Sequence, residues 1–505
     1  MSYKKSKLTS KLITNVLKKA GVLLKSPKSL GDKSIFYNDL QFDTRKIKRK
    51  RTLFVIKGRF RVTYLKKELF SYIDGLILNP KFENKNIQVP CWFVSDTQIA
   101  LASLSAAFFG HPEKKLTILG ITGTKGKTSA AYMVYKMLDK LTHHQVALFS
   151  TIDTIITKNF RFKSELTTPE SYELFLNMKR ALDNKKRYLV MEVSSQSYLK
   201  ERVFGIHFKV GSFLNISPDH IGINEHPNFA DYLAKKKMLA ENSDIFVSNI
   251  DDKHGKEFLD HASLYGGKTI SVSSSNPRAN VFFKIFQCNL DKSIFDIKYD
   301  NKHTKRYILD IPGDFNVYNA SIAITMIYSM GFNAFSARDA LAKLKIPGRM
   351  AKLKSKRHGL VIVDYAHNGE SLEKLLVFLR SQHPKGKIIL VIGSPGNKGQ
   401  DRRQQFGKVI SRYVDISILT TDDPGTENPH LINNEIRRAI YNPKVKLYEI
   451  LDRKLAIKKA ISLGNNNDLV ILAAKGDDAF QKTNHKNVPY LGDNKVALKA
   501  LDYLE

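Results

Sequence analysis

A glycine-rich turn between a buried strand and a helix constrains the fold of this chain more than any other feature. Residues 116–122 read LTILGIT, residues 120–129 read GITGTKGKTS, and residues 129–141 read SAAYMVYKMLDKL. Main-chain N–H groups at such a turn, together with the positive end of the helix, form a binding site for anions. Glycine is needed because the backbone must bend tightly and approach the phosphates closely. The pattern predicts a phosphate-binding loop within an α/β domain.

The loop also carries the side chains that nucleotide chemistry needs. Lys127 can reach the β- and γ-phosphates of ATP, and Thr128 can offer its hydroxyl to Mg²⁺. The general pattern has a glycine five residues before Gly126, where this chain has Ile121, so the loop is a variant. We expect ATP to be bound by Gly123, Thr124, Lys125, Gly126, Lys127, Thr128 and Ser129.

Strand-like and helical runs alternate along the whole chain and fall into three blocks, residues 1–112, 113–346 and 347–505. Alternating strands and helices favour parallel sheets, which bind ligands at the carboxyl ends of their strands. We therefore predict an α/β protein of three domains: a small N-terminal domain, a central phosphate-loop domain and a Rossmann-like C-terminal domain. The expected strands are 52–56, 75–79, 91–95, 116–122, 188–195, 243–250, 360–366, 387–394, 414–423 and 468–475.

The composition adds a strong positive charge. The 505 residues include 82 Lys and Arg against 48 Asp and Glu, which gives a formal net charge of +34. Nucleic-acid binding, attraction of polyanionic substrates such as ATP, and a general lysine bias on solvated surfaces would each explain it. The basic residues are spread over the chain and are not interleaved with aromatic residues as in a nucleic-acid platform. The distribution therefore does not favour nucleic acid as a partner.

Other features of the composition indicate a cytoplasmic protein. The chain has no apolar run of ~18 residues, so no membrane span is expected. Its basic N-terminus lacks the apolar region of a signal peptide, and an amphipathic helix from Leu8 to Leu23 is expected instead. Cys91 and Cys288 are far apart and lack metal-ligand spacing, so neither a disulfide framework nor a zinc site is predicted. We expect a monomer in a reducing compartment.

Two further polar residues follow strand-like runs in the central block. Glu192 ends the run YLVME, and His220 follows in the segment NISPDH at 215–220. ATP chemistry needs carboxylates or similar groups to hold Mg²⁺ beside the phosphates. Since both residues come just after strands, both are candidates to face the phosphate loop.

The segment GTKGKT resembles the phosphate loop of the Mur ligases and of the related folylpolyglutamate synthetases. The order of the later motifs resembles the Mur ligase central domain, which implies that Glu192 and His220 are metal ligands. In DYLAKKKML, at 231–239, alignment on the tyrosine and the apolar pair matches Lys236 to the family's carbamylated lysine. The resemblance implies a CO₂-derived carbamate on Lys236 that helps to hold a second Mg²⁺. A lysine near metal cations favours loss of its proton, and carbamylation makes its side chain negative.

Further motifs match the family's substrate sites. The segment TTPES at 167–171 resembles the acceptor-binding segment of the tripeptide-forming Mur ligases, and Asp43-Thr44-Arg45 resembles their turn at the uridine diphosphate. Arg202 suits an acceptor site because a guanidinium forks onto carboxylate or phosphate. The residues that the resemblance assigns to the UDP-linked precursor are Thr44, Thr167, Thr168, Ser194 and Arg202.

The resemblance extends to the nucleotide site. GDFNVYN at 313–319 matches the segment whose second asparagine, here Asn319, reads adenine, a task that suits a side-chain amide. Arg349 in PGRM matches the arginine between domains that reaches ATP, and Asp364 in DYAH matches the residue that contacts ribose. A hinge is expected near residues 346–350.

The amino acid that is added depends on a pocket in the third block. Enzymes specific for meso-diaminopimelate hold its distal carboxylate with the arginine of Asp-Asn-Pro-Arg, whereas lysine-adding enzymes carry Asp-Asp-Pro-Asn. Here the segment 422–425 reads DDPG, so Asp422 and Asp423 would accept an ammonium rather than a carboxylate. Gly425 departs from the asparagine of the lysine-adding enzymes, which leaves ornithine as an alternative. Lys398 lies near the place of another arginine of the diaminopimelate enzymes, which leaves diaminopimelate as a second alternative. Asp478 matches the acid that binds the incoming α-ammonium.

The resemblance therefore implies an ATP-dependent ligase of peptidoglycan synthesis. It would add L-lysine to the D-glutamate of UDP-N-acetylmuramoyl-L-alanyl-D-glutamate through an acyl phosphate, with catalysis by Lys127, Glu192, His220, Lys236 and Arg349. A folylpolyglutamate-type ligase should lack the N-terminal block and TTPES. A basic ATPase acting on nucleic acid would explain the charge but not the acceptor motifs. An inactive scaffold homologue would not need its intact catalytic set.

Overall fold

The computed structural model describes residues 7–27, 36–58, 60–83, 87–219, 221–222, 225–299, 303–355, 357–397 and 399–504. Two predicted site residues, His220 and Lys398, lie outside this described part. The chain divides into two compact units. The first comprises residues 1–283, 298–303 and 318–337, and the second comprises 284–297, 304–317 and 338–505. The architecture is α/β with three main sheets, while the predicted boundaries after residues 112 and 346 stay predictions.

The N-terminal sheet has the order β2-β7-β6-β5-β4 and is parallel except for β2. Its strands are β2 (Leu23–Lys25), β7 (Cys91–Val94), β6 (Ile73–Leu78), β5 (Thr52–Val55) and β4 (Asp39–Gln41). A separate short pair joins β1 (Leu8–Thr9) to β3 (Phe36–Tyr37). Helix α2 (Thr97–Phe108) packs against β5 and β6 and contacts α1 (Ser10–Lys19). Asp96 caps α2 by accepting from the N–H groups of Gln98 and Ile99.

The predicted N-terminal helix is shorter than expected. It begins after Thr9, whose hydroxyl accepts from the N–H of Leu12, and it ends at Lys19. Gly21 has a φ of +72°, a left-handed conformation that terminates helices. The residues that would have extended the helix to Leu23 enter β2 instead, because Leu23 pairs with Val94 of β7.

In the described part of the chain, the central sheet has eleven strands in the order β11-β10-β9-β12-β8-β13-β14-β15-β16-β17-β18. In this spatial order, every neighbouring pair between β9 and β16 is parallel. At one edge, β10 pairs antiparallel with β9 and forms an antiparallel hairpin with β11. The strands are β8 (Thr117–Thr122), β9 (Val146–Phe149), β10 (Asp153–Thr157), β11 (Phe160–Lys163), β12 (Tyr188–Glu192), β13 (Phe208–Phe213), β14 (Ser243–Asn249), β15 (Lys268–Ser273), β16 (Val281–Cys288), β17 (Ser293–Tyr299) and β18 (His303–Leu309).

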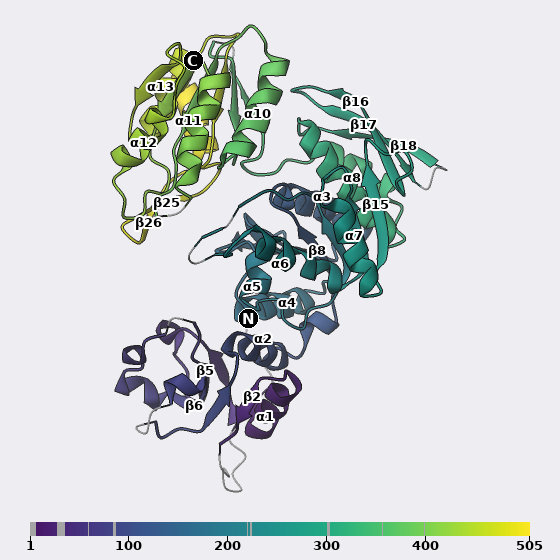
Figure 1. Cartoon of the computed structure of the whole chain (residues 1–505), viewed down its shortest axis with the longest axis vertical. Coiled ribbons are helices and arrows are strands. Elements are labelled where there is room, and N and C mark those ends of the chain that lie inside the picture. The colour runs from purple at the N-terminus through teal and green to yellow at the C-terminus, as the bar shows by residue number, and fades with distance from the viewer. Residues whose placement is uncertain are drawn as a thin grey trace. The chain divides into compact units, whose positions relative to one another are not determined.

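Helices cover both faces of this sheet. The core on one face contains apolar residues of β8, β9 and β12 with those of α4, α6 and α7, whereas α3 packs on the other face against β8, β9 and β12 (Figure 1). The helices of this part of the chain are α3 (Lys127–Leu141), α4 (Ser171–Asp183), α5 (Ser195–Leu199), α6 (Phe229–Glu241), α7 (Gly255–Leu264) and α8 (Asp314–Ser329). Helix α9 (Arg338–Ala342) belongs to the second unit. Full burial of β8 and β12 matches their continuous apolar sequence.

The register of the central strands brings the predicted motifs together. Glu192 at the end of β12 lies opposite Ile121 of β8, and Phe213 at the end of β13 lies opposite Thr122. Because the three strands are parallel and end at the same edge, the segments that follow them meet there. This edge carries the phosphate loop after β8, Glu192 on β12 and Asn215 after β13.

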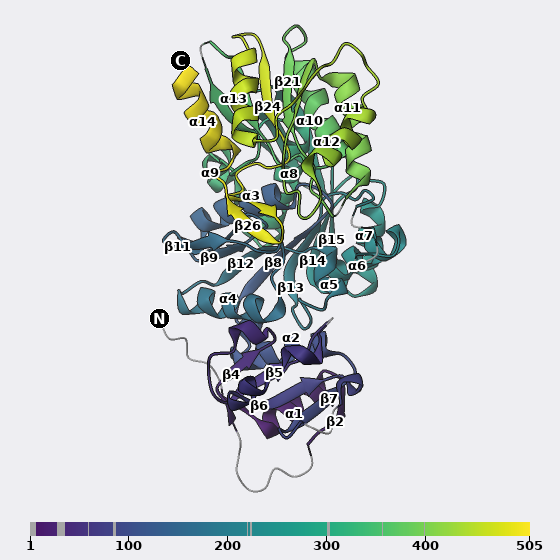
Figure 2. The same ribbon diagram turned by 90° about the vertical axis from the view of Figure 1, so that its left-hand side faces the viewer.

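The C-terminal sheet has the order β19-β20-β24-β21-β22-β23, with β19 antiparallel to the rest. The strands are β19 (Ala351–Lys354), β20 (Leu360–Val363), β21 (Ile388–Ile392), β22 (Ile416–Leu419), β23 (Lys446–Glu449) and β24 (Leu469–Leu472). Helices α13 (Arg453–Leu463) and α14 (Asp493–Leu504) cover one face (Figure 2). The other face carries α10 (Gly369–Gln382), α11 (Asp401–Tyr413) and α12 (Pro429–Arg438) (Figure 2). A hairpin of β25 (Phe480–Thr483) and β26 (Lys486–Pro489) follows β24.

All ten predicted strands are found, with ends that differ from the predicted ranges by a few residues. The hairpins β10–β11 and β25–β26 were not predicted, because their sequences mix charged and apolar residues without a clear period. Among the described helices, none is both long enough and apolar enough to cross a membrane.

Candidate active site

The phosphate loop is shaped around Gly126, which caps α3. Gly126 has a φ of +84°, and a Cβ added there would lie 2.3 Å from Oδ1 of Asn319. Glycine therefore allows both the left-handed turn and the close approach of the Asn319 amide. Asn319 lies on α8 and is only 4% exposed. The first unit thus brings the predicted adenine reader to the loop that is predicted to hold the phosphates.

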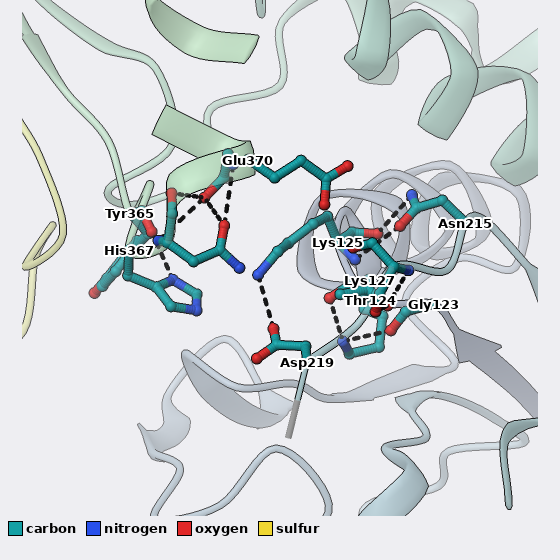
Figure 3. A network of polar contacts seen from close by, with 12 residues as sticks. Gly123, Thr124, Lys125, Lys127, Asn215, Asp219, Tyr365, His367 and Glu370 are labelled. Atoms are coloured by element: carbon teal, nitrogen blue, oxygen red, sulfur yellow. Dashed lines mark hydrogen bonds and ion pairs between the residues drawn. The ribbon is translucent and has the colours of Figure 1, made fainter. Parts of the chain in front are cut away.

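Two lysines of the loop make definite contacts. The Nζ of Lys127 donates to the carbonyl oxygens of Gly123 at 2.8 Å and Thr124 at 3.0 Å. The Nζ of Lys125 donates to Oδ2 of Asp219 at 3.1 Å, as Figure 3 shows. Lys127 therefore lies along the loop that is predicted to bind phosphate. Its ammonium donates to two main-chain carbonyls, and a bound phosphate would replace these carbonyls as the acceptor.

The segment after β13 holds the loop from the other side. Asn215 accepts from the N–H of Lys125 at 2.9 Å and donates its amide to the Lys125 carbonyl at 3.1 Å (Figure 3). The Thr124 hydroxyl lies 3.0 Å from the hydroxyl of Tyr232 and also bonds the main chain of Ser217. The backbone of the loop is therefore fixed by two other segments before any nucleotide binds.

Glu192 is placed directly against the loop. The hydroxyl of Thr128 donates to Oε1 of Glu192 at 2.9 Å, and Glu192 is 1% exposed. Oε1 also accepts from the N–H of Thr151 at 2.7 Å. A hydroxyl and a carboxylate oxygen at this distance form a donor set that suits Mg²⁺. The described residues contain no group of three or more His, Cys, Asp or Glu side chains arranged to hold a metal. The fit of this site to Mg²⁺ therefore rests on Thr128 and Glu192 alone.

Lys236 points from α6 into the same site. It is 2% exposed, and its Nζ donates to the carbonyl of Gly123 at 2.7 Å. Burial lowers the pKa of the Lys236 ammonium well below its ordinary value, and the positive charge of Lys127 lowers it further. A buried amine with a lowered pKa is available in the neutral form that reacts with CO₂.

The predicted acceptor residues form a connected group beside Glu192. The hydroxyl of Thr168 donates to the Glu192 carbonyl at 3.0 Å and accepts from the N–H of Ser194 at 3.1 Å. The hydroxyl of Thr151 lies 3.0 Å from both Oγ1 of Thr167 and Oε2 of Glu192. The group therefore reaches from the acceptor segment to the carboxylate beside Thr128.

Arg202 is bound to a carboxylate of the protein itself. Its guanidinium donates to Oε1 of Glu170 at 2.8 Å and to the Thr168 carbonyl at 3.3 Å. The Nζ of Lys57, from the N-terminal domain, also pairs with Glu170. Burial opposes ionisation of Glu170, but the charges of Lys57 and Arg202 outweigh it and lower its pKa. Two cations thus meet at the acceptor segment around one carboxylate.

Thr44 lies apart from these contacts, in a turn of the N-terminal domain. It begins a 3₁₀ helix, Thr44–Lys46, that Asp43 caps by accepting from the N–H of Arg45. Arg45 also forks onto the Asp43 carboxylate and is otherwise exposed. The neighbouring Lys46 pairs with Glu173 of α4 at 2.8 Å.

In the second unit, Asp364 and Arg349 lie next to each other in structure. Asp364 follows β20, is 9% exposed, and accepts from the N–H of Met350 at 2.9 Å. Burial raises the pKa of Asp364, and the Arg349 charge opposes this shift. The guanidinium of Arg349 lies 5.1 Å from the ring centre of Tyr365, and its buried Nε has no hydrogen-bond partner among the described residues. An unpartnered buried guanidinium N–H is a donor available to a ligand oxygen.

The acids of the predicted amino-acid pocket surround a buried lysine. Nζ of Lys475 lies 2.5 Å from Asp423, 3.5 Å from Asp422 and 3.7 Å from Asp478. Burial opposes the charge on Lys475, but Asp422 and Asp423 outweigh it and raise its pKa. Burial also raises the pKa of Asp422. The charge of the buried Arg453, which pairs with Asp493, also acts on Asp422. Three carboxylates thus surround Lys475, rather than an open pair of acids.

Sequence reasoning missed several residues of the site. Thr151 follows β9 at the same sheet edge as Glu192, so its place after a buried strand was a usable signal. Lys57 carried no comparable signal, because its partner is far away in sequence. Lys475 lies three residues before the predicted Asp478, but nothing in the sequence marked its pairing with Asp423. The predicted His220 and Lys398 lie outside the described residues.

Comparison with known proteins agrees with this geometry. The family described as the Mur ligase middle domain matches residues 121–327, and that described as the Mur ligase, glutamate ligase domain matches residues 348–476. The UDP-N-acetylmuramyl-tripeptide synthetase of Ligilactobacillus salivarius is 42% identical over 94% of this chain and 96% of its own. The UDP-N-acetylmuramoyl-L-alanyl-D-glutamate--L-lysine ligase of Streptococcus pyogenes serotype M3 is 40% identical over 91% and 92%.

Solved structures show the same fold. A UDP-N-acetylmuramoyl-L-alanyl-D-glutamate--2,6-diaminopimelate ligase aligns with a TM-score of 0.67 at 20% identity, over 99% of both chains. The MurF ligase of Thermotoga maritima in complex with ADP aligns with a TM-score of 0.60 at 16% identity, over 92% of this chain and 98% of that one.

The phosphate loop and its carboxylate, in an α/β fold with three main sheets, indicate a nucleotide-binding enzyme, and the matches to named ligases make it an ATP-dependent ligase that joins an acid to an amino acid. The chain belongs to the Mur ligase family.

Proposed function

We propose that this protein adds L-lysine to the D-glutamate of UDP-N-acetylmuramoyl-L-alanyl-D-glutamate, with hydrolysis of ATP, in peptidoglycan synthesis. The observation that carries the proposal is the position of Thr151, whose hydroxyl lies 3.0 Å from both Thr167 and Glu192. The predicted acceptor segment is thereby linked to the carboxylate beside the phosphate loop. The named relatives from Ligilactobacillus salivarius and Streptococcus pyogenes support the same reaction.

In the first step, the terminal carboxylate of the acceptor attacks the γ-phosphorus of ATP, an acyl phosphate forms and ADP leaves. Lys127 would leave the carbonyls of Gly123 and Thr124 and bind the transferring phosphoryl group. Arg349, with its unpartnered Nε, is proposed as a second cation for the phosphates. Asn319 would read adenine and Asp364 would contact ribose.

In the second step, the neutral α-amino group of lysine attacks the acyl carbon. The tetrahedral intermediate collapses to the amide, phosphate leaves, and the amine gives up a proton. Asp478 is proposed to bind the incoming α-ammonium, and its Oδ1 lies 3.3 Å from the hydroxyl of Tyr365. A hinge near residues 346–350 would bring the amino acid to the acyl phosphate, and such positioning supplies up to ~7–11 kcal/mol.

Two Mg²⁺ ions are proposed, held by Thr128, Glu192, His220 and a carbamate on Lys236. Bound there, they would neutralise phosphate charge and orient the γ-phosphoryl group. The chain's own contribution is to hold the ligand oxygens in place before metal binding, as the 2.9 Å contact of Thr128 with Glu192 does. The low pKa of Lys236 favours the neutral amine that carbamylation requires.

The preference for lysine rests on the acids around Lys475. With Asp422, Asp423 and Asp478 around Lys475, and with Arg453 paired to Asp493, the site keeps a net negative charge that suits a side-chain ammonium. A distal carboxylate, as in diaminopimelate, would meet these acids, and the nearby Arg453 is already paired with Asp493. Ornithine stays an alternative because Gly425 replaces the asparagine of lysine-adding enzymes, and diaminopimelate stays one because of Lys398. We further propose that the enzyme acts as a monomer in the cytoplasm.

The experiment is phosphate release by the purified protein with ATP, Mg²⁺, the UDP-linked dipeptide and L-lysine. We expect release only when all four are present, because the acyl phosphate forms on the acceptor and is consumed by the amine. Release without acceptor would indicate a simple ATPase, and release that is stimulated by DNA or RNA would favour the nucleic-acid alternative. The absence of release with every amino acid would support an inactive homologue.

A further inference from the structure

Three side chains, two of them buried and the third half-buried, form a hydrogen-bonded chain beside the phosphate loop. Nε2 of His226 lies 2.9 Å from the hydroxyl of Ser195, and Nδ1 lies 2.6 Å from Oδ2 of Asp231. His226 is fully buried and Ser195 is 2% exposed. None of the three residues is assigned a role in the reaction above.

The two bonds fix the orientation of the His226 ring. A carboxylate only accepts, so Nδ1 of His226 donates to Asp231. A hydroxyl can both donate and accept, so Ser195 serves as the partner of Nε2 whether or not Nε2 carries a proton.

The chain joins three segments that each carry part of the proposed site. Ser195 begins α5, directly after the acceptor residue Ser194. Asp231 is in the first turn of α6, the helix of Lys236. His226 lies between them in sequence, and its carbonyl accepts from the N–H of Gly222 at 3.0 Å. Through these contacts His226 fixes the segment after β13 to both other segments.

The contacts continue from Asp231 to the phosphate loop. The next residue, Tyr232, packs edge-on against the His226 ring, with ring centres 5.2 Å apart. The Tyr232 hydroxyl lies 3.0 Å from that of Thr124, and Nζ of Lys236 lies 4.7 Å from the Tyr232 ring centre. A displacement of His226 would therefore move the first turn of α6, and with it Tyr232 and Lys236.

We propose that His226 is a positioning residue that orients α6, so that Lys236 and Tyr232 meet the phosphate loop in the geometry needed for carbamylation and catalysis. This inference rests on the proposed function for the role of Lys236. Residues that support ligands in this way typically change activity or metal affinity by roughly 10–100-fold when they are replaced. The geometry of the chain, rather than any charge change on His226, carries the proposal.

The test compares His226→Ala with His261→Ala. Nε2 of His261 lies 2.8 Å from Oε1 of Glu241, at the opposite end of the same helix and away from the site. Both variants lose one histidine–carboxylate bond to α6, so they are matched in type. The measurements are the melting temperature, kcat, and the carbamate signal in ¹³C NMR as ¹³C-bicarbonate is titrated.

We expect His226→Ala to lower kcat and to raise the half-saturating bicarbonate concentration by roughly 10–100-fold each, with His261→Ala at wild-type values. Ser195→Ala, a milder change, should shift both values in the same direction if His226→Ala proves too unstable to purify. A His226→Ala protein with wild-type kcat and bicarbonate response would overturn the proposal, even if its melting temperature fell. If the wild type forms no amide, the proposed function fails, and the ¹³C titration alone then decides the inference.

Replacement of Asp231 gives a second, independent test. In Asp231→Asn the amide can donate to Nδ1, His226 can donate from Nε2 to Ser195, and the chain survives with its direction reversed. We therefore expect Asp231→Asn to keep most of the activity that Asp231→Ala loses. Equal losses in the two variants would contradict a positioning role for the chain.

Discussion

Lys236 donates from its Nζ to the main-chain oxygen of Gly123 at 2.7 Å, so a lysine with a lowered pKa is fixed on the phosphate loop itself. The contact joins α6 to the turn after β8, two segments that are more than a hundred residues apart in sequence. A buried amine is costly for the folded protein, and such groups are retained where chemistry needs them. Several of the expected outcomes below depend on this arrangement.

Lys236→Met should abolish turnover without loss of stability. Loss of a group that stabilises the transferring phosphoryl is expected to reduce kcat by at least ~10²-fold. The folded pKa of Lys236 lies below its unfolded value, so its burial cost is full at low pH and disappears as the pH rises past the unfolded value. The melting temperature of the variant should therefore exceed that of the wild type by the largest margin at low pH. Lys235→Met is the control, and a Lys236→Met enzyme with full activity at low bicarbonate would rule out the carbamate.

Glu192→Gln should separate metal binding from folding. The amide keeps the size of the side chain and can still accept from Thr128 and Thr151, but it loses the charge that Mg²⁺ needs. We expect kcat to fall by roughly 10²-fold or more and the Mg²⁺ concentration for half-maximal rate to rise. Glu113→Gln, at a buried glutamate that pairs with His111, is the matched control. An unchanged Mg²⁺ requirement would remove Glu192 from the metal site.

Lys475→Met should destabilise the C-terminal unit. The change leaves the carboxylates of Asp422 and Asp423 buried without their cation, which costs about 3–5 kcal/mol in comparable pairs. Calorimetry should show the loss of stability, while the KM for ATP changes little. Adding Asp423→Asn to Lys475→Met should restore part of the stability, because it removes one of the unpaired charges. No recovery in the double variant would argue against direct pairing.

Asp251 should make the central domain sensitive to acid. Burial opposes its ionisation, but hydrogen bonds from Ser273, Ser275 and Ser274 outweigh it and lower the pKa of Asp251 to about 2. Its stabilising effect is therefore complete above the ordinary aspartate pKa and is lost as the pH falls toward about 2. Asp251→Asn should cost about 1–3 kcal/mol at pH 7, a difference that vanishes in acid. Unfolding curves at several pH values would measure the difference in stability between Asp251→Asn and the wild type, with the exposed Asp260→Asn as control. A difference that does not change with pH would contradict this account.

The sequence alone was sufficient for the parts of the site that are local. A phosphate loop is a continuous segment with a fixed order of strand, turn and helix, and Glu192 ends a strand whose apolar run is easy to read. Parallel strands then force both to the same sheet edge, so their contact could be expected from pattern.

The rest depends on contacts between distant segments. The pairing of Lys57 with Glu170 and the chain from Ser195 through His226 to Asp231 require the fold, because no spacing in the sequence marks them. The acids at 422 and 423 were predicted as a receptor for an ammonium, yet Lys475 already pairs with Asp423. A single sequence lists the charges of a pocket but not which of them neutralise each other.

The most direct measurement is the mass of the product formed from ATP, Mg²⁺ and UDP-N-acetylmuramoyl-L-alanyl-D-glutamate with L-lysine, L-ornithine and meso-diaminopimelate in competition. The account predicts a product heavier than the acceptor by one lysine residue, and little diaminopimelate product because the site around Lys475 is acidic. A dominant ornithine product would agree with the acidic site but contradict the lysine assignment. A dominant diaminopimelate product would keep the ligase and contradict the lysine assignment, whereas no product with any of the three would contradict the central claim.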